Sequence, residues 1–217
     1  MHFEFTGIKT SLAFMVVITS VLISGCAHRS PAPRLYVLGA EGGWRSIADR
    51  TVSDSNYTVR LIQVRMPDYL DRPNLVTRIS DNEIKMESFH RWGMPIDAEF
   101  KGRLAGEIAA MLPAAYVETS SRPVKGRDEY GIVVDVMRLD GELGGDVELI
   151  AEWTLTRSGD GVDHETIVQR ISRHNENAGD PAYEVYVETI GNVISLLGRE
   201  IAGFIMNLEK EASPEDA

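Results

Sequence analysis

A stretch of about forty residues, Met66 to Leu104, constrains the fold more than any other part of the chain. Within it, Pro73 lacks an amide donor and favours extended geometry in the residue before it, so a loop is expected to end there and a strand to begin. Residues 74–80 and 83–89 flank Asp81-Asn82, whose side chains tolerate the backbone angles of a tight turn. The pattern predicts a β-hairpin.

The expected register of this hairpin separates an apolar face from a charged face. If Ser80 lies opposite Glu83, residues two apart along each strand share a face, because side chains alternate along a strand. The register then pairs Ile79 with Ile84 and Thr77 with Met86 on the apolar face, and places Arg78, Lys85, Val76 and Glu87 on the other.

A helix is expected to follow the hairpin, from Pro95 to about Leu112. Proline suits a first helical turn, and the acidic residues Asp97 and Glu99 favour the positive end of the helix dipole. Apolar residues recur at four-residue steps, as in a helix with one face on a core, at Ile96, Phe100, Leu104, Ile108 and Leu112. Pro113 then ends the helix.

The other periodic segments predict one α+β domain. Strands are expected at 35–38, 58–64, 114–119, 130–139, 147–156 and 165–173, and a second long helix from Pro181 to about Leu208. The segment 130–139 is apolar on both faces, as an interior strand is, whereas 165–173 is polar enough for a sheet edge. Runs of strands with two long helices predict a mixed, largely antiparallel sheet on which both helices lie.

Composition excludes several classes of function. The 217 residues include 33 acidic and 22 basic ones, a net charge of -11, so the chain repels nucleic acid, which is bound mainly through Lys and Arg. The single cysteine, Cys26, allows neither an intrachain disulfide nor a cysteine-based zinc site. No two histidines after Cys26 have the close spacing of metal ligands, and no nucleotide-binding or hydrolase motif occurs. We therefore expect no metal, no cofactor and no nucleic-acid partner.

Residues 1–25 differ from the rest of the chain. Lys9 precedes an uninterrupted run of apolar and small residues, which matches the short core of a secretory signal better than a spanning helix of about 20 residues. The run ends in Leu22-Ile23-Ser24-Gly25-Cys26, which resembles a bacterial lipobox. We expect a signal peptide at 1–25 and a covalent lipid on Cys26; the alternative is an ordinary signal with an incidental cysteine.

Residues 26–34 are expected to tether a folded domain, 35–209, that is followed by a polar tail, 210–217. At roughly 3.3 Å per residue, the tether reaches at most about 30 Å, so the domain would work close to a membrane. Ala27, rather than Asp, follows the cysteine. By resemblance to other lipoproteins of double-membrane bacteria, this residue favours sorting to the outer membrane; retention in the inner membrane is the alternative.

The central stretch also carries a family resemblance. The segments Tyr69-Leu70-Asp71-Arg72-Pro73, Leu75-Val76-Thr77-Arg78, Asn82 and Arg91-Trp92 with Pro95 resemble the central motif of the PqiC-like ABC-type transport auxiliary lipoproteins. The chain differs from that family where Gly93-Met94 stands in place of the usual Ala-Glu. The resemblance extends over most of the mature chain and implies a three-layer α/β sandwich-like fold.

The resemblance implies a non-enzymatic accessory of an MCE-type ABC lipid-transport system. Such a lipoprotein is anchored at the periplasmic face of the outer membrane, associates with an MCE-domain periplasmic protein and can form ring-like homo-oligomers. The alternatives are a structural or cell-wall-binding lipoprotein, and an envelope hydrolase that uses carboxylates such as Asp68 and Asp71.

Seven residues are candidate contacts with the protein partner: Tyr69, Asp71, Arg72, Pro73, Arg78, Arg91 and Trp92. Arginine and aromatic side chains are enriched at interface hot spots because they offer area and directed hydrogen bonds at low entropic cost. The alternative is structural. In that case the arginines pair with carboxylates near in sequence, Asp71, Glu83 and Glu87, and Trp92 covers the junction of sheet and helix.

Overall fold

The computed structural model describes residues 31–39, 55–119, 129–159 and 162–212. The chain divides into two units, Met1–Ala32 and Pro33–Ala217, and the fold described below is that of the second. The expected signal peptide, Cys26 and most of the tether lie outside the described residues.

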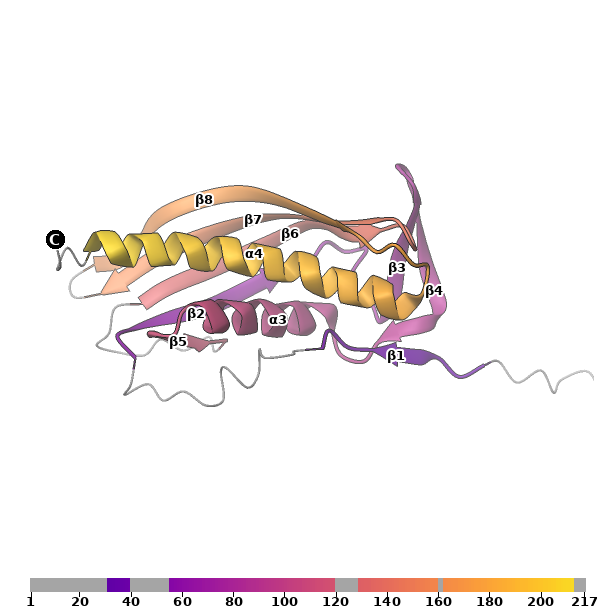
Figure 1. Ribbon diagram of the computed structural model, residues 1–217, viewed down its shortest axis with the longest axis horizontal. Coiled ribbons are helices and arrows are strands. Elements are labelled where there is room, and N and C mark those ends of the chain that lie inside the picture. The colour runs from indigo at the N-terminus through magenta and orange to yellow at the C-terminus, as the bar shows by residue number, and fades with distance from the viewer. Residues whose placement is uncertain (1–30, 40–54, 120–128, 160–161, 213–217) are drawn as a thin grey trace, which may run out of the picture. The chain divides into compact units, whose positions relative to one another are not determined.

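Five strands form the larger sheet, in the order β5 (Ala115–Glu118), β2 (Tyr57–Arg65), β6 (Glu129–Gly141), β7 (Asp146–Gly159) and β8 (Val162–Asn177). β2 pairs in parallel with both β5 and β6, whereas β6, β7 and β8 are antiparallel. The sheet is therefore mixed, with its three longest strands antiparallel (Figure 1).

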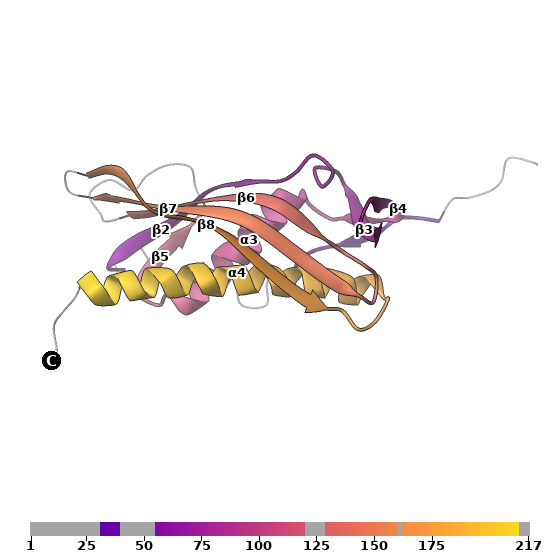
Figure 2. The ribbon, with the colours of Figure 1, turned by 90° about the horizontal axis from the view of Figure 1, so that it is seen from above.

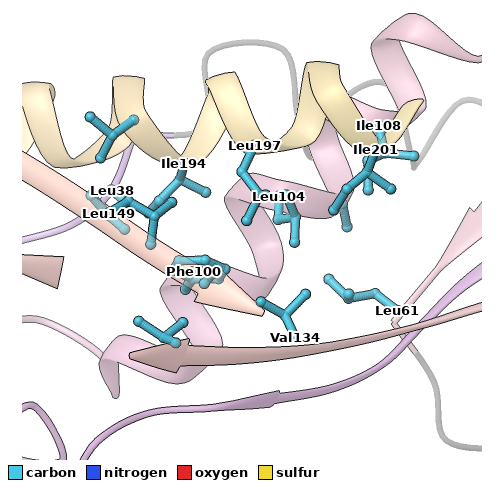
Figure 3. Packing of buried hydrophobic residues seen from close by; sticks show 14 of the residues in the cluster. Leu38, Leu61, Phe100, Leu104, Ile108, Val134, Leu149, Ile194, Leu197 and Ile201 are labelled. Atoms are coloured by element: carbon cyan, nitrogen blue, oxygen red, sulfur yellow. The ribbon is translucent and has the colours of Figure 1, made fainter. Parts of the chain in front are cut away.

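Two helices, α3 (Ile96–Met111) and α4 (Tyr183–Ala212), lie against the larger sheet. α3 contacts β2 and β5, α4 contacts β7 and β8, and the two helices contact each other (Figures 1 and 2). Figure 3 shows the resulting core, in which buried side chains of both helices and the sheet meet, among them Phe100, Leu104, Ile108, Val134, Leu149, Ile194, Leu197 and Ile201. Burial of each such side chain stabilises the fold by about 1.5–3 kcal/mol.

A second, smaller sheet consists of β1 (Arg34–Tyr36), β4 (Glu83–Trp92) and β3 (Asn74–Ser80), in that order. β1 is parallel to β4, and β3 and β4 form the antiparallel hairpin that the sequence predicts. This small sheet lies at one end of the larger sheet, beside the N-terminal end of α4 (Figure 1). Because α3 begins directly after β4, the small sheet also fixes where the first helix starts.

The structure confirms the α+β class and the elements predicted from periodicity. β6 lies inside the larger sheet and β8 at its edge, as their polarity predicts. In β7 the alternate residues Val147, Leu149, Ala151, Trp153 and Leu155 are all fully buried. The strand order, including the three parallel pairings, was not predictable because periodicity does not say which strands are neighbours.

The predicted register of the β3–β4 hairpin is wrong beyond its first pair. After Ser80 and Glu83, the ladder shifts by one residue, which gives the pairs Arg78–Ile84, Thr77–Lys85 and Val76–Met86. Ile79 and Met86, expected on an apolar inner face, are 51% and 47% exposed. The shift coincides with a contact that local pairing rules do not include, because the Arg78 guanidinium binds the carboxylate of Asp140 in β6.

Helix α4 is the one helix within the described ranges that is long and apolar enough to cross a membrane. However, 61% of its most apolar window is buried inside the folded unit. Its apolar stripe contacts α3 and the sheet, so the hydrophobicity of α4 is that of a core helix.

Substitutions at two glycines of α4 would measure how closely α4 approaches α3. A Cβ added at Gly198 would lie 2.9 Å from the Cβ of Glu107, whereas one added at Gly203 would meet no atom within 4 Å. Gly203→Ala is expected to raise the free energy of unfolding by about 0.5–1 kcal/mol, because alanine favours the helix. Gly198→Ala is expected to lower it by roughly 1 kcal/mol, because overpacking outweighs that gain. Denaturant titrations measure both, and equal gains at the two positions would contradict the close approach.

Candidate functional site

The central motif forms a groove between the loop before β3 and the junction of β4 with α3. Its volume is about 360 Å³, and its lining comes from two segments, residues 71–73 and 92–96. A backbone hydrogen bond joins the two walls, because Trp92 N donates to Pro73 O at 2.7 Å. We call this feature the motif groove.

The loop wall of the motif groove is shaped by tight turns. Leu70 N donates to Pro67 O at 2.9 Å and Arg72 N to Leu70 O at 2.7 Å, while the Leu70 side chain is buried in the core. The Arg72 guanidinium donates to the backbone oxygen of Asp68 at 3.2 Å and contacts the Met86 sulfur at 2.8 Å. The pairing of Arg72 with a neighbouring carboxylate, which the structural alternative expected, is therefore wrong.

The other wall of the motif groove is held by β1. Gly93 N donates to Tyr36 O at 2.7 Å. A Cβ at Gly93 would lie only 3.0 Å from Val37 Cγ1, so the absence of a side chain lets β1 and its continuation lie close to β4. Trp92 is buried at the junction of sheet and helix, as the structural alternative expected, and Met94 is 48% exposed.

A cluster of charged side chains lies where the hairpin meets the larger sheet. Asp140 in β6 is fully buried and accepts a hydrogen bond from Tyr69 Oη at 2.8 Å. Arg78 binds the same carboxylate with two nitrogens, at 2.6 and 2.9 Å, and Arg138 donates to it at 3.0 Å. We call these four residues the Asp140 cluster. It connects the motif loop, β3 and β6.

The electrostatics of the Asp140 cluster favour the charged carboxylate. Burial alone would raise the pKa of Asp140, but the hydrogen bonds from Arg78, Tyr69 and Arg138 outweigh burial and lower that pKa below its ordinary value. Burial and the hydrogen bond to Asp140 raise the pKa of the Tyr69 phenol, which therefore stays protonated and donates. The cluster is an internal, satisfied network rather than a reactive one.

Helix α4 holds the small sheet from its inner side. The Tyr186 hydroxyl donates to Val76 O in β3 at 2.7 Å and accepts from Gly141 N in β6 at 3.1 Å. The rings of Tyr183 and His90 stack with their centroids 3.5 Å apart. The hairpin that carries the motif groove is therefore fixed both to α4 and to the larger sheet.

The structure divides the seven candidate contact residues into three groups. It brings together Asp71, Arg72, Pro73 and Trp92, which line the motif groove. Tyr69 and Arg78 belong to the Asp140 cluster, where internal hydrogen bonds engage their polar groups. Arg91 is an exposed residue of β4, and its side chain has no hydrogen bond or ion pair with any described residue.

Sequence reasoning missed several residues that shape this region. Met94 and Gly93 line the motif groove, and Asp140, Arg138 and Tyr186 support it from β6 and α4. One signal was available, because Asp140 is a carboxylate at the end of an otherwise apolar strand, where burial requires a charged or hydrogen-bonding partner. The identity of its partners depends on strand order, which the sequence does not show.

The described residues contain no group of three His, Cys, Asp or Glu side chains able to hold a metal ion. Asp68 and Asp71, the carboxylates that a hydrolase would use, are both exposed to solvent. Asp71 lies at the wall of the motif groove beside Arg72 and Pro73, an arrangement suited to recognition of a surface.

Comparison with known proteins gives one family and several relatives. The sequence model for the ABC-type transport auxiliary lipoprotein component matches residues 45–202. The chain is 25% identical over 196 residues to the intermembrane transport lipoprotein PqiC of Escherichia coli K12. The alignment covers 90% of this chain and 98% of that protein. The PqiC of Shigella flexneri gives the same figures.

Two solved structures share the fold. One, an uncharacterized protein, superimposes with a TM-score of 0.63 at 20% identity and covers 81% of this chain and 99% of its own. The other, from Xanthomonas campestris, gives a TM-score of 0.53 at 11% identity over 84% of this chain and 99% of its own. At these identities the structures support the fold alone.

Proposed function

Because the chain belongs to the family of ABC-type transport auxiliary lipoprotein components, we propose that it is a non-enzymatic accessory subunit of an MCE-type intermembrane lipid-transport system. A lipid on Cys26 holds it at the periplasmic face of the outer membrane. An MCE-domain periplasmic protein binds at the motif groove, and copies of the chain assemble into a ring-like homo-oligomer.

The relatives support the transport part of this proposal. The E. coli protein is named an intermembrane transport lipoprotein, and it matches nearly the whole of this chain. The sequence supports the anchor, because a signal-like segment ends in the lipobox-like run before Cys26. Ala27 supports the choice of the outer membrane by the resemblance given above.

The motif groove is the observation that carries the partner site. Two segments that are about twenty residues apart in sequence converge there on one open surface. Its lining combines two residues of opposite charge, Asp71 and Arg72, with the apolar surfaces of Pro73, Trp92 and Met94. Apolar pockets with directed polar groups at their edge are typical of the hot spots of protein interfaces. Its two walls are hydrogen-bonded to each other, so little ordering is needed when a partner binds.

Met94→Glu is expected to reduce co-purification of the MCE-domain partner at least about tenfold, because a buried unpaired carboxylate costs more than the 1.4 kcal/mol that a tenfold change requires. Met94 is 48% exposed in the free protein, so the substitution should leave folding unchanged. Ile171→Glu, at a 59% exposed position on β8, is the matched control and should co-purify the partner normally.

The same experiment separates the proposal from its alternatives. Unchanged co-purification of Met94→Glu would reject the motif groove as the partner site. Wild-type protein that captures isolated cell wall but no MCE-domain partner would instead support a cell-wall-binding lipoprotein. Sedimentation of the detergent-solubilised protein measures whether copies assemble into a ring.

A further inference from the structure

Exposed apolar side chains gather on the small sheet. Eight large apolar residues of the described part of the chain are exposed. Six of them belong to the small sheet or directly follow one of its strands, namely Leu35, Val37, Ile79, Met86, Phe89 and Met94. Single exposed apolar residues are normal, but a group on one small element points to a contact surface.

Three of these residues share one face of the small sheet. Leu35 lies opposite Arg91 in the parallel pairing of β1 with β4. Val37 and Phe89 are assigned to the same side as this pair by their exposure, because the residues between them and the pair, Tyr36 and His90, are buried or half-buried. Leu35, Val37 and Phe89 are 67%, 57% and 43% exposed. We call Leu35, Val37, Phe89 and Arg91 the outer face.

The other side of the same strands is already occupied. Tyr36 and Trp92, which are paired in the register, are both buried. His90 stacks on Tyr183 of α4 and accepts or donates a hydrogen bond with the Tyr36 hydroxyl at 2.8 Å. The inner side therefore faces the body of the domain, and the outer face is directed away from it.

Part of the outer face lies close in sequence to Cys26, the expected lipid attachment site. β1 begins at Arg34, eight residues after Cys26. Fully extended at roughly 3.3–3.6 Å per residue, this segment reaches no more than about 30 Å. A lipid on Cys26, as proposed above, therefore keeps Arg34, the residue directly before Leu35 of the outer face, within that distance of the bilayer surface.

We propose that the outer face rests on the lipid bilayer, and this inference depends on the proposed lipid anchor. Leu35, Val37 and Phe89 enter the boundary between headgroups and acyl chains, and Arg91 extends to the phosphates. The Arg91 guanidinium has no partner among the described residues. An arginine suits that position, because it can bury its methylenes while it binds phosphate. The chain carries a net charge of -11, so the contact depends on apolar burial rather than on overall charge.

A nitroxide label at Phe89→Cys tests the contact in the full, lipid-modified chain reconstituted in vesicles of phosphatidylethanolamine and phosphatidylglycerol. Cys26 is the only cysteine, and acylation consumes its thiol, so the introduced cysteine is the one site that reacts. Oxygen concentrates in the bilayer and a nickel chelate stays in water. We expect the ratio of oxygen to nickel accessibility to be several-fold higher at position 89, which is 43% exposed, than at Ile171→Cys, a 59% exposed position on β8.

Two results would overturn the inference. A ratio at position 89 equal to that at position 171 would mean that the outer face stays in water. A label at 89 that is shielded from both reagents would mean that protein, either the partner or a second copy, covers the face. Mass spectrometry of the same sample reports acylation of Cys26. Co-purification of the MCE-domain partner is measured separately, so failure of the bilayer contact and failure of the proposed function are distinguished.

Discussion

Asp140→Asn is expected to lower the free energy of unfolding by about 3 kcal/mol, because it leaves the guanidinium groups of Arg78 and Arg138 without their buried carboxylate. Three side chains donate to Asp140, and none of its surface is exposed. An asparagine keeps the shape but replaces one acceptor oxygen with a donor that would face other donors. For a domain of this size the melting temperature should fall by roughly 6–12 °C.

Asp135→Asn provides the matched control in the same strand. Asp135 pairs with Arg65 on an exposed surface, and the two side chains are 35% and 55% exposed. Loss of an exposed ion pair costs at most about 1 kcal/mol. Thermal unfolding of both variants gives the comparison. Equal losses would show that the Asp140 cluster does not stabilise the contact between the hairpin and the larger sheet.

The pH dependence of stability supplies a second measurement on the same variant. The pKa of Asp140 is lower in the folded protein than its ordinary value of 3.8. A carboxylate of this kind contributes its full stability above the unfolded pKa and loses it as pH falls through the folded pKa. The difference in stability between wild type and Asp140→Asn should therefore stay constant from neutral pH down to about 5 and shrink below about 4.

Exchange of residues 1–26 for a cleavable secretory leader that contains no lipobox cysteine is expected to move nearly all of the protein from the membrane fraction to the soluble periplasm. Each acyl methylene that enters a bilayer contributes about 0.8 kcal/mol, so several chains bind firmly. The outer face alone should hold the protein only weakly. Full burial of its three apolar side chains contributes about 1.5–3 kcal/mol each, and the association cost of an estimated 4–15 kcal/mol offsets most or all of that gain.

Ala27→Asp is the control for the leader exchange. It leaves Cys26 intact, so the protein should stay in the membrane fraction but move from the outer to the inner membrane. Mass spectrometry of the wild type should show an acylated Cys26 as the first residue. A leader-exchanged protein that still sediments fully with membranes would mean that protein contacts, and not the lipid, hold it in place.

The sequence predicts the elements of this fold better than their arrangement. The four-residue repeat from Ile96 to Leu112 and the alternation in β7 each depend on one face being buried, which is a local property. The parallel neighbours of β2 and the parallel pairing of β1 with β4 are contacts between distant segments, and no local pattern specifies them.

The candidate site shows the same division. The motif gave four residues that the structure brings to one groove, because the turn at Pro73 and the helix start at Pro95 are locally determined. The predicted hairpin register failed next to Arg78, whose contact with Asp140, 62 residues away in sequence, no local pattern specifies. Met94 was missed because, from sequence alone, a single methionine before a helix does not reveal what faces it.

β1, the first described strand after the tether, is hydrogen-bonded to β4 in the small sheet. If Cys26 carries the proposed lipid, tension from the membrane would reach the domain at Arg34, which is held by the ion pair with Glu184 at 2.5 Å and by the three-residue ladder to β4. β1 has no hydrogen-bonded neighbour in the larger sheet. If β1 were detached, the hydrogen-bond ladders between β5, β2, β6, β7 and β8 would therefore remain complete.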